Sequence, residues 1–142
     1  MKTKILFLVC FLGLMIQATG QGFKQGAVVV TNTYTVNLNP GVTMDQWINF
    51  YATKYIPEME KAYPGVKEYV VWGDRGEKKD QFGSIMIFES KEVRDKYYPT
   101  PDSTTPSEAA AAAEEKLKTI NEEFAKYLQD GGKRVYTDWI VK

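Results

Sequence analysis

The sequence predicts an α+β domain whose strands and helices follow one another in the order β-α-β-β-α-β. Three observations predict this order. Four segments have the apolar patterns of strands, two longer segments repeat apolar residues at helical spacing, and a short charged link between the second and third strands is typical of a hairpin. The chain of 142 residues is long enough for a single domain with a packed core.

The beginning of the chain predicts a secretory signal peptide. A basic start precedes an apolar run over residues 5–16, and Ala18 and Gly20 place small residues just before the expected cleavage at Gln21. The run is shorter than the roughly 20 apolar residues that a membrane-spanning helix needs. We therefore expect an exported protein, periplasmic or extracellular, with no membrane segment in its mature form. Its expected parts are a signal peptide, a flexible tail and one domain, at residues 1–20, 21–26 and 27–142.

Composition excludes several classes of functional site. The chain has no histidine, which excludes a Ser-His-Asp triad, histidine-ligated zinc and a proximal-histidine haem. Cys10 is the one cysteine, and signal-peptide cleavage removes it. The 18 Lys+Arg balance the 18 Asp+Glu, and basic residues are adjacent only in short pairs, which does not favour nucleic-acid binding. We expect no cofactor and no nucleic-acid partner.

The first strand and the first helix have clear local signals. Residues 27–38 alternate apolar with polar side chains and predict the first strand. Thr43 and Gln46 have the spacing of a capping box at a helix start. Apolar residues then recur at helical spacing as far as Ala62, and Pro57 should kink or split the helix.

The middle of the chain predicts a hairpin and a short helix. Residues 66–73 and 82–89 predict the second and third strands, and the charged segment 74–80 predicts the turn between them. The third strand is apolar on both faces, which favours a central position in the sheet. Residues 90–98 predict a short helix that Pro99 stops.

The last part of the chain predicts a long helix and a final strand. Thr105 is the expected N-cap, with Pro106 at the first helical position, and Gly131-Gly132 should end the helix. Residues 135–141 predict the last strand. The complete order is ferredoxin-like, which predicts a four-stranded antiparallel sheet with the helices on one face.

A sheet with helices on one face leaves its other face uncovered. The alternation of the strands places Val29, Tyr69, Val71, Ile85 and Ile87 on that face. Monomers seldom expose so large an apolar patch. We therefore expect a homodimer in which the two sheets pack face to face.

Three features together resemble a known superfamily. They are the element order, the segment 55–65 with its Tyr-Ile-Pro and Tyr-Pro-Gly triplets, and the segment 88–92, Phe-Glu-Ser-Lys-Glu, after the third strand. The chain resembles the dimeric α/β-barrel superfamily, which includes the antibiotic-biosynthesis monooxygenases, small haem-degrading monooxygenases, and the EthD and NIPSNAP families. The resemblance covers essentially residues 27–141 and implies a homodimeric α/β barrel. Because one fold hosts many functions, it specifies the activity poorly.

Two positions match, or fail to match, the oxygenases of that superfamily. Cofactor-free monooxygenases and haem degraders place an Asn in the first strand and a Trp at the end of the third, and haem degraders add a His. Asn32 matches the Asn, Phe88 stands where the Trp would be, and the chain has no His. The resemblance therefore implies loss of haem degradation. It leaves open a cofactor-free monooxygenase that acts on a small aromatic or polyketide-like substrate.

Polar and aromatic residues expected between the helices and the sheet suggest a ligand site. Asn32 shares a face with apolar residues, so it either orients a substrate carbonyl or dioxygen in a pocket or is satisfied by other groups of the core. The aromatic residues either line a flat pocket or pack as core. The sequence predicts a role in binding or assembly, and a small apolar or aromatic molecule is the candidate ligand. It identifies no catalytic residue and no metal ligand. The candidate ligand-binding residues are Asn32, Tyr55, Trp72, Phe88, Tyr97 and Tyr98.

Overall fold

The computed structural model describes residues 22–100, 106–130 and 132–142. The predicted signal peptide lies outside the described residues, so its cleavage stays a prediction. In the part of the chain that is described, no helix has both the length and the apolar character needed to cross a membrane.

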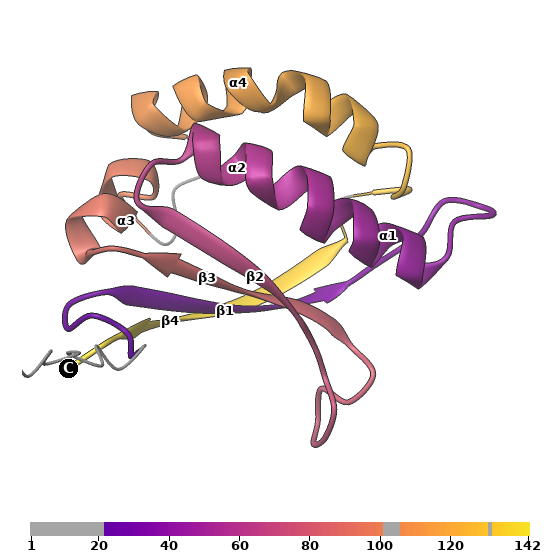
Figure 1. Ribbon diagram of the computed structural model, residues 1–142, viewed down its shortest axis with the longest axis horizontal. Coiled ribbons are helices and arrows are strands. Elements are labelled where there is room, and N and C mark those ends of the chain that lie inside the picture. The colour runs from indigo at the N-terminus through magenta and orange to yellow at the C-terminus, as the bar shows by residue number, and fades with distance from the viewer. Residues whose placement is uncertain (1–21, 101–105, 131) are drawn as a thin grey trace, which may run out of the picture.

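Four strands form one antiparallel sheet, as predicted. They are β1 (Val28–Thr35), β2 (Val66–Trp72), β3 (Phe82–Phe88) and β4 (Lys133–Ile140), and their order across the sheet is β2-β3-β1-β4. This order and the alternation with helices are those of a ferredoxin-like α+β fold (Figure 1). β3 lies between β2 and β1, which confirms its predicted central position.

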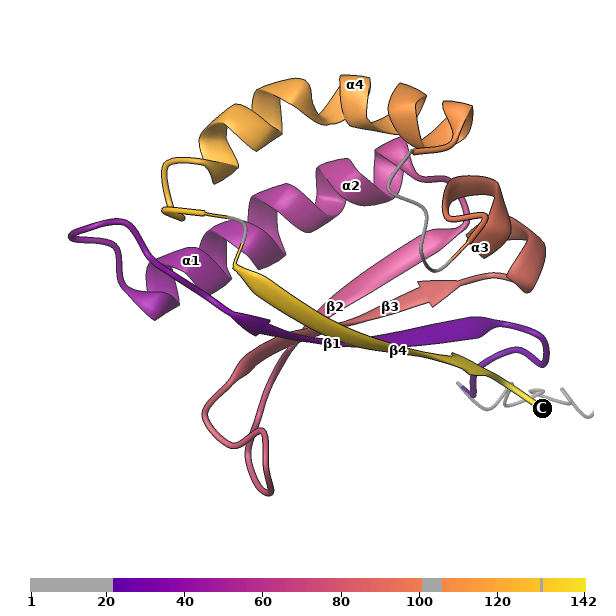
Figure 2. The same cartoon turned by 180° about the vertical axis from the view of Figure 1, so that it is seen from behind.

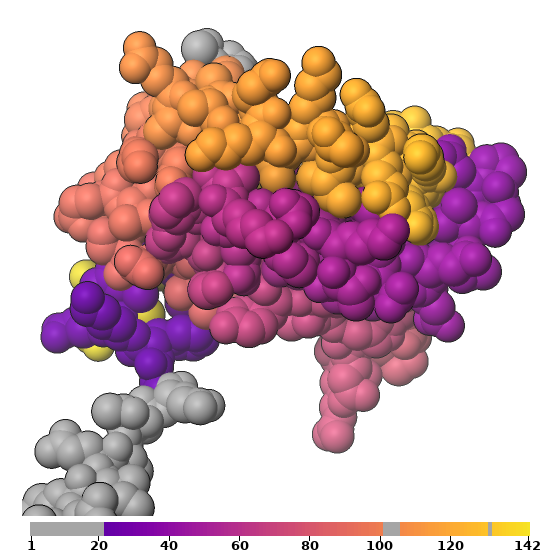
Figure 3. All heavy atoms as spheres, turned by 45° about the horizontal axis from the view of Figure 1, so that its top comes forward, coloured from indigo at the N-terminus to yellow at the C-terminus, as the bar shows by residue number. Residues whose placement is uncertain are grey.

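The helices lie together on one face of the sheet (Figures 1 and 2). The elements are α1 (Met44–Phe50), the π-helical segment η1 (Tyr51–Tyr55), α2 (Ile56–Ala62), α3 (Lys91–Tyr97) and α4 (Glu108–Phe124). Figure 3 shows α4 packed along α2 over the top of the molecule, while the β2–β3 hairpin projects away from this layer. The capping box of Thr43 and Gln46 is present at the start of α1, as predicted.

Pro57 splits the first helical run in the predicted way. Proline has no N–H to donate within a helix, and its ring clashes with the carbonyl four residues earlier. The chain widens into η1 just before Pro57, and the N–H of Ile56 donates to the carbonyl of Tyr51, five residues back. π-Helical turns of this kind are frequent at functional sites.

The long helix is shorter at both ends than predicted. It begins at Glu108, and Ser107 caps it by accepting the N–H of Ala110, so the predicted cap at Thr105 is wrong. It ends at Phe124 and not at Gly131-Gly132. The following residues instead bond to the chain after β1, where Leu128 forms an isolated bridge with Leu38.

Two buried clusters hold the helices on the sheet. In the first, aliphatic side chains of β1 and α4 meet Phe88 of β3, with Val28 and Leu117 almost completely buried. The second is aromatic and centres on Trp47, whose ring centroid lies 4.9 Å from that of Phe124 and 5.1 Å from that of Tyr51. The cores therefore lie at the two ends of the helix-facing side of the sheet.

The opposite face of the sheet is not covered by any described helix (Figures 1 and 2). Val29 pairs with Ile87 and Trp139, and Tyr69 pairs with Ile85, on the parity opposite to the core residues of β1. This placement confirms the predicted composition of the uncovered face. Trp139 is 58% and Tyr69 is 55% exposed, so the face presents large apolar side chains to solvent.

Candidate functional site

The helix layer leaves the edge strand β4 uncovered. Among the described elements, α4 makes its main contacts with α2, α3 and η1, and every residue of β4 is exposed. Three adjoining cavities of about 230, 130 and 170 Å³ lie between the sheet and the helices on this side. A cavity of about 150 Å³ accommodates a benzene ring, so the space suits a small aromatic molecule.

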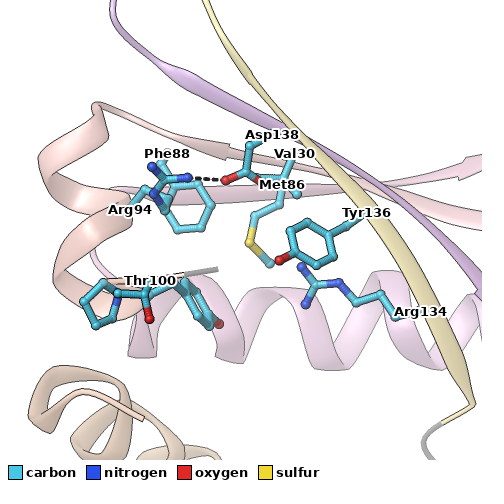
Figure 4. A pocket seen from close by; sticks show the side chains of 10 residues that line it. Val30, Met86, Phe88, Arg94, Thr100, Arg134, Tyr136 and Asp138 are labelled. Carbon is cyan, nitrogen blue, oxygen red and sulfur yellow. Dashed lines mark hydrogen bonds and ion pairs between the residues drawn. The ribbon is translucent and has the colours of Figure 1, made fainter. Parts of the chain in front are cut away.

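The cavities are neighbours that have several lining residues in common. Met86, Phe88 and Tyr98 line both the first and the second, while Tyr51 lines both the second and the third. Arg134 lines all three. In Figure 4, Arg134 extends from β4 toward Met86 on the floor of the first cavity.

The far end of the first cavity is closed by an ion pair. Arg94 of α3 pairs with Asp138 of β4 (Figure 4). Arg94 also pairs with Asp95 (2.6 Å). The Arg94–Asp138 bridge ties the short helix α3 to the otherwise uncovered strand. Because both partners have a counter-ion, the rim at this end has little net charge.

Arg134 is held by a buried amide. Its Nε donates to Oδ1 of Asn32 (2.9 Å), and its guanidinium lies over the ring of Tyr136, 4.8 Å from the centroid. The amide group of Asn32 in turn donates to Oγ of Ser84 (3.1 Å). Among the described carboxylates, none forms an ion pair with Arg134. The site therefore contains a positioned cation that forms no ion pair with any described residue.

Glu68 places a buried carboxyl group on the wall of the second cavity, which Arg134 also lines. The residue is 4% exposed, and its Oε1 accepts a hydrogen bond from the hydroxyl of Tyr51 (3.0 Å). Burial raises the pKa of Glu68, although hydrogen bonds from Ser84 and Tyr51 and the positive charge of Arg134 act to lower it. Desolvation is the largest cause, so this carboxyl is a stronger base than an exposed glutamate.

Tyrosine hydroxyl groups surround the two charged residues. The π-helical turn brings Tyr51 and Tyr55 into a stacked pair with centroids 5.1 Å apart, and both line the second and third cavities. Burial raises the pKa of Tyr51, Tyr55, Tyr34 and Tyr98 above the usual value of a phenol. These hydroxyls consequently remain protonated at neutral pH and can serve as hydrogen-bond donors.

Half of the residues proposed from the sequence lie on the cavity walls, namely Tyr55, Phe88 and Tyr98. Asn32 lines none of the three cavities and lies behind Arg134. Tyr97 is buried against Tyr63, and its hydroxyl donates to the carbonyl of Pro64 (3.2 Å). Trp72 ends β2 as an exposed residue away from these walls.

Glu68 and Arg134 are not among the site residues predicted from the sequence. Both had a usable signal, because alternation along a strand assigns each residue to a face. Glu68 shares its parity with Val66 and Val70, and Arg134 shares its parity with Tyr136. A charged residue on the helix-facing side of a strand is expensive to bury, which makes it a candidate for function.

No group of three or more acidic, cysteine or histidine residues within the described ranges is arranged to hold a metal ion. The candidate site therefore combines Arg134, the carboxyl group of Glu68, the Arg94–Asp138 ion pair at its rim and an aromatic wall.

Comparisons with known proteins identify structural neighbours but no family. No protein-family model matches the sequence, and no curated protein is significantly similar to it. Among solved structures, a dimeric protein of unknown function with a ferredoxin-like fold from Bacteroides fragilis has 14% identity, with a TM-score of 0.36 over 82% of this chain and 97% of that chain. An EthD-like protein from Ralstonia eutropha has 15% identity, with a TM-score of 0.41 over 80% and 92% of the two chains. Because both TM-scores are below 0.5, the fold assignment rests on the strand order itself.

Proposed function

We propose that the protein binds a small aromatic or apolar molecule that carries an anionic oxygen, such as an aromatic carboxylate. The observation that carries the proposal is the position of Arg134. Arg134 lines three neighbouring cavities with aromatic walls, its guanidinium is oriented by Asn32, and it has no ion-pair partner among the described residues.

The donor geometry of Arg134 supports an anionic ligand. A guanidinium has five N–H donors, and Nε is the one that donates to Asn32. The others form the planar fork that matches a carboxylate. Met86, Phe88 and Tyr98 provide the apolar surface that most small-molecule sites use to bury the body of a ligand.

A calorimetric titration with 1-naphthoate tests this proposal. Saturable binding is expected, and Arg134→Gln should weaken it roughly ten- to a hundredfold, since a hydrogen bond to a charged group contributes about 1.5–3 kcal/mol. The neutral 1-naphthamide should lose no comparable affinity in the same variant. Arg75→Gln, which alters an exposed arginine of the hairpin, is the matched control. Equal affinity of Arg134→Gln and the unmutated protein for naphthoate would contradict the proposal.

The composition of the uncovered face favours a second copy of this chain as the binding partner. In a two-fold symmetric interface the same surface meets itself, so a strongly charged face would repel its copy. On this parity the charged residues of the paired strands are Lys67, which pairs with Glu60 at the edge of the sheet, and Lys133 at the start of β4. Both lysines lie at the margins of a face whose other paired residues are apolar or neutral, so we include a homodimer through the sheet in the proposal.

The proposal also includes export, which rests on the signal-peptide pattern of residues 1–20. Intact mass of the exported protein tests it. A chain that begins within a few residues of Gln21 is expected, and a stable full-length form held in the membrane would contradict it.

The geometry supports ligand binding more strongly than cofactor-free oxygenation. The monooxygenase interpretation depended on an Asn32 free to orient a substrate or dioxygen. Both groups of this amide are engaged, one with Ser84 and the other with Arg134. Asn32 is therefore assigned the role of positioning Arg134.

A further inference from the structure

The second cavity brings together two groups that the binding proposal does not use jointly. Glu68 is buried on β2, Arg134 reaches in from β4, and both line the same space of about 130 Å³. The positive charge of Arg134 acts to lower the pKa of Glu68, against the larger effect of burial, which raises it. A base and a fixed cation on one cavity are the two groups that removal of a proton next to a carbonyl requires.

We propose that the site catalyses enolisation of an aromatic carbonyl compound, with Glu68 as the proton acceptor and Arg134 as the group that stabilises the oxyanion. This inference rests on the proposed function, because the substrate must first bind at Arg134. The substrate class is an aryl-substituted keto acid or a related acidic ketone. Its ring occupies the wall formed by Met86, Phe88 and Tyr98.

The reaction is balanced without a further reactant. The carboxylate of Glu68 takes a proton from the carbon next to the carbonyl. The electron pair of that C–H bond forms the C=C bond, while the carbonyl π pair moves to oxygen and is stabilised by the guanidinium of Arg134. Return of the proton from Glu68 to carbon restores the ketone, and its delivery to oxygen gives the enol.

The surroundings of Glu68 suit a base more than a purely structural carboxyl. A structural carboxylate in a protein interior is normally paired or fully hydrogen-bonded. Glu68 instead lacks an ion pair with any described residue, and its hydrogen-bond donors, Tyr51 and Ser84, are neutral hydroxyl groups. Removal from water strengthens a carboxylate as a base, and the burial of Glu68 has this effect.

Phenylpyruvate is a suitable probe because it combines an aromatic ring, a carboxylate and an enolisable carbonyl. Exchange of its benzylic hydrogens in D₂O is followed by proton NMR, with and without the protein. We expect exchange faster than in buffer. Since a general base contributes roughly 10²–10⁴-fold, Glu68→Gln should lose about that factor of the protein-dependent rate while still binding phenylpyruvate in a calorimetric titration.

Two further variants make the test specific. Glu123→Gln changes a carboxylate of α4 that pairs with Lys54 and does not line the three cavities, and it should exchange at the unmutated rate. If Glu68→Gln does not fold, Glu68→Asp takes its place. The shorter side chain withdraws the carboxylate from the substrate, so its rate should fall without loss of binding.

The outcomes separate the two proposals. Saturable binding of phenylpyruvate with exchange no faster than in buffer, or with a rate that Glu68→Gln leaves unchanged, overturns the enolisation proposal and leaves the binding proposal standing. Absence of saturable binding of both phenylpyruvate and naphthoate overturns the binding proposal, and enolisation with it.

Discussion

The two edge strands of the sheet, β2 and β4, carry similar side chains in different environments. On β2, Val66 is 3% exposed and Glu68 is buried beside it. On β4 every residue is exposed, including the helix-facing Tyr136 and Ile140. The difference comes from the helices. α2 connects directly to β2 and packs on it, whereas α4 leans on α2 and α3 and leaves β4 open.

The different environments of the two edge strands place a buried carboxyl group and a solvent-exposed guanidinium in one candidate ligand site. Glu68 and Arg134 both project from helix-facing positions, one on each edge strand. The covered strand removes its carboxyl group from water, and the open strand keeps its guanidinium near solvent. A ligand that enters beside β4 meets the cation first and the buried base beyond it.

The largest expected effect concerns self-association. A dimer through the sheet would cover the uncovered face, including the side chains of β4 that lie on it. Ile85→Asp should abolish a sheet-to-sheet dimer. Burial of an isoleucine side chain contributes about 1.5–3 kcal/mol, and symmetry counts each residue twice. The measurement is light scattering coupled to gel filtration. Ala112→Asp, at an exposed position of α4, should remain dimeric. A stable monomer for the unmutated mature protein would show that β4 stays open.

A matched pair of truncations compares the strands directly. Val66→Ala on β2 should lower the free energy of unfolding by about 2 kcal/mol, because it removes buried methyl groups and leaves a cavity. Ile140→Val, at a helix-facing position of β4, should cost less than about 0.5 kcal/mol in urea unfolding at a dilution where the chain is monomeric. Equal losses would mean that β4 is covered in solution.

The aromatic wall near β4 should contribute less than the cation. Tyr98→Ala should weaken naphthoate binding roughly two- to tenfold, as expected for loss of one aromatic contact of about 0.5–1.5 kcal/mol. Trp72→Ala, at the end of the covered strand, should leave the affinity unchanged. A larger loss from Trp72 than from Tyr98 would move the site away from the cavities described.

The smallest expected effect is on stability and concerns Glu68. Because burial raises the pKa of this carboxyl above its value in the unfolded chain, the native state binds the proton more tightly. Protonation of Glu68 therefore stabilises the folded state. This contribution is complete at acidic pH and is lost as the pH rises through the pKa of Glu68 in the native state. Glu68→Gln should therefore raise Tm at pH 8 relative to the unmutated protein, and the gain should shrink toward pH 4. Glu115→Gln, on α4, is the control.

A higher Tm for the unmutated protein at pH 8 than for Glu68→Gln would contradict this account of the carboxyl. It would mean that the ionised form of Glu68 stabilises the fold, as in a structural ion pair.

Local signals in the sequence predicted the fold well. The capping box at Thr43, the break at Pro57 and the two-sided apolar pattern of residues 82–89 each follow from nearby residues, and the structure has all three features. The end of α4 was not predictable in the same way. Its last turn is replaced by backbone bonds to the segment after β1, a contact between residues about 90 positions apart.

The site was only partly predictable for a related reason. Aromatic residues near helix ends indicated a pocket, but the choice between wall and core depended on where α4 rests. Tyr98 lines the cavity while its neighbour Tyr97 is core. Asn32 was recognised as unusual by its parity, yet its role depends on Arg134, which is 102 residues away in the chain.

A crystal structure of the mature protein grown with 1-naphthoate tests the central claim most directly. The account predicts the carboxylate about 3 Å from the guanidinium nitrogens of Arg134 and the ring against Met86 and Phe88. Naphthoate bound elsewhere, with Arg134 turned to solvent and the cavity filled by protein side chains, would contradict it.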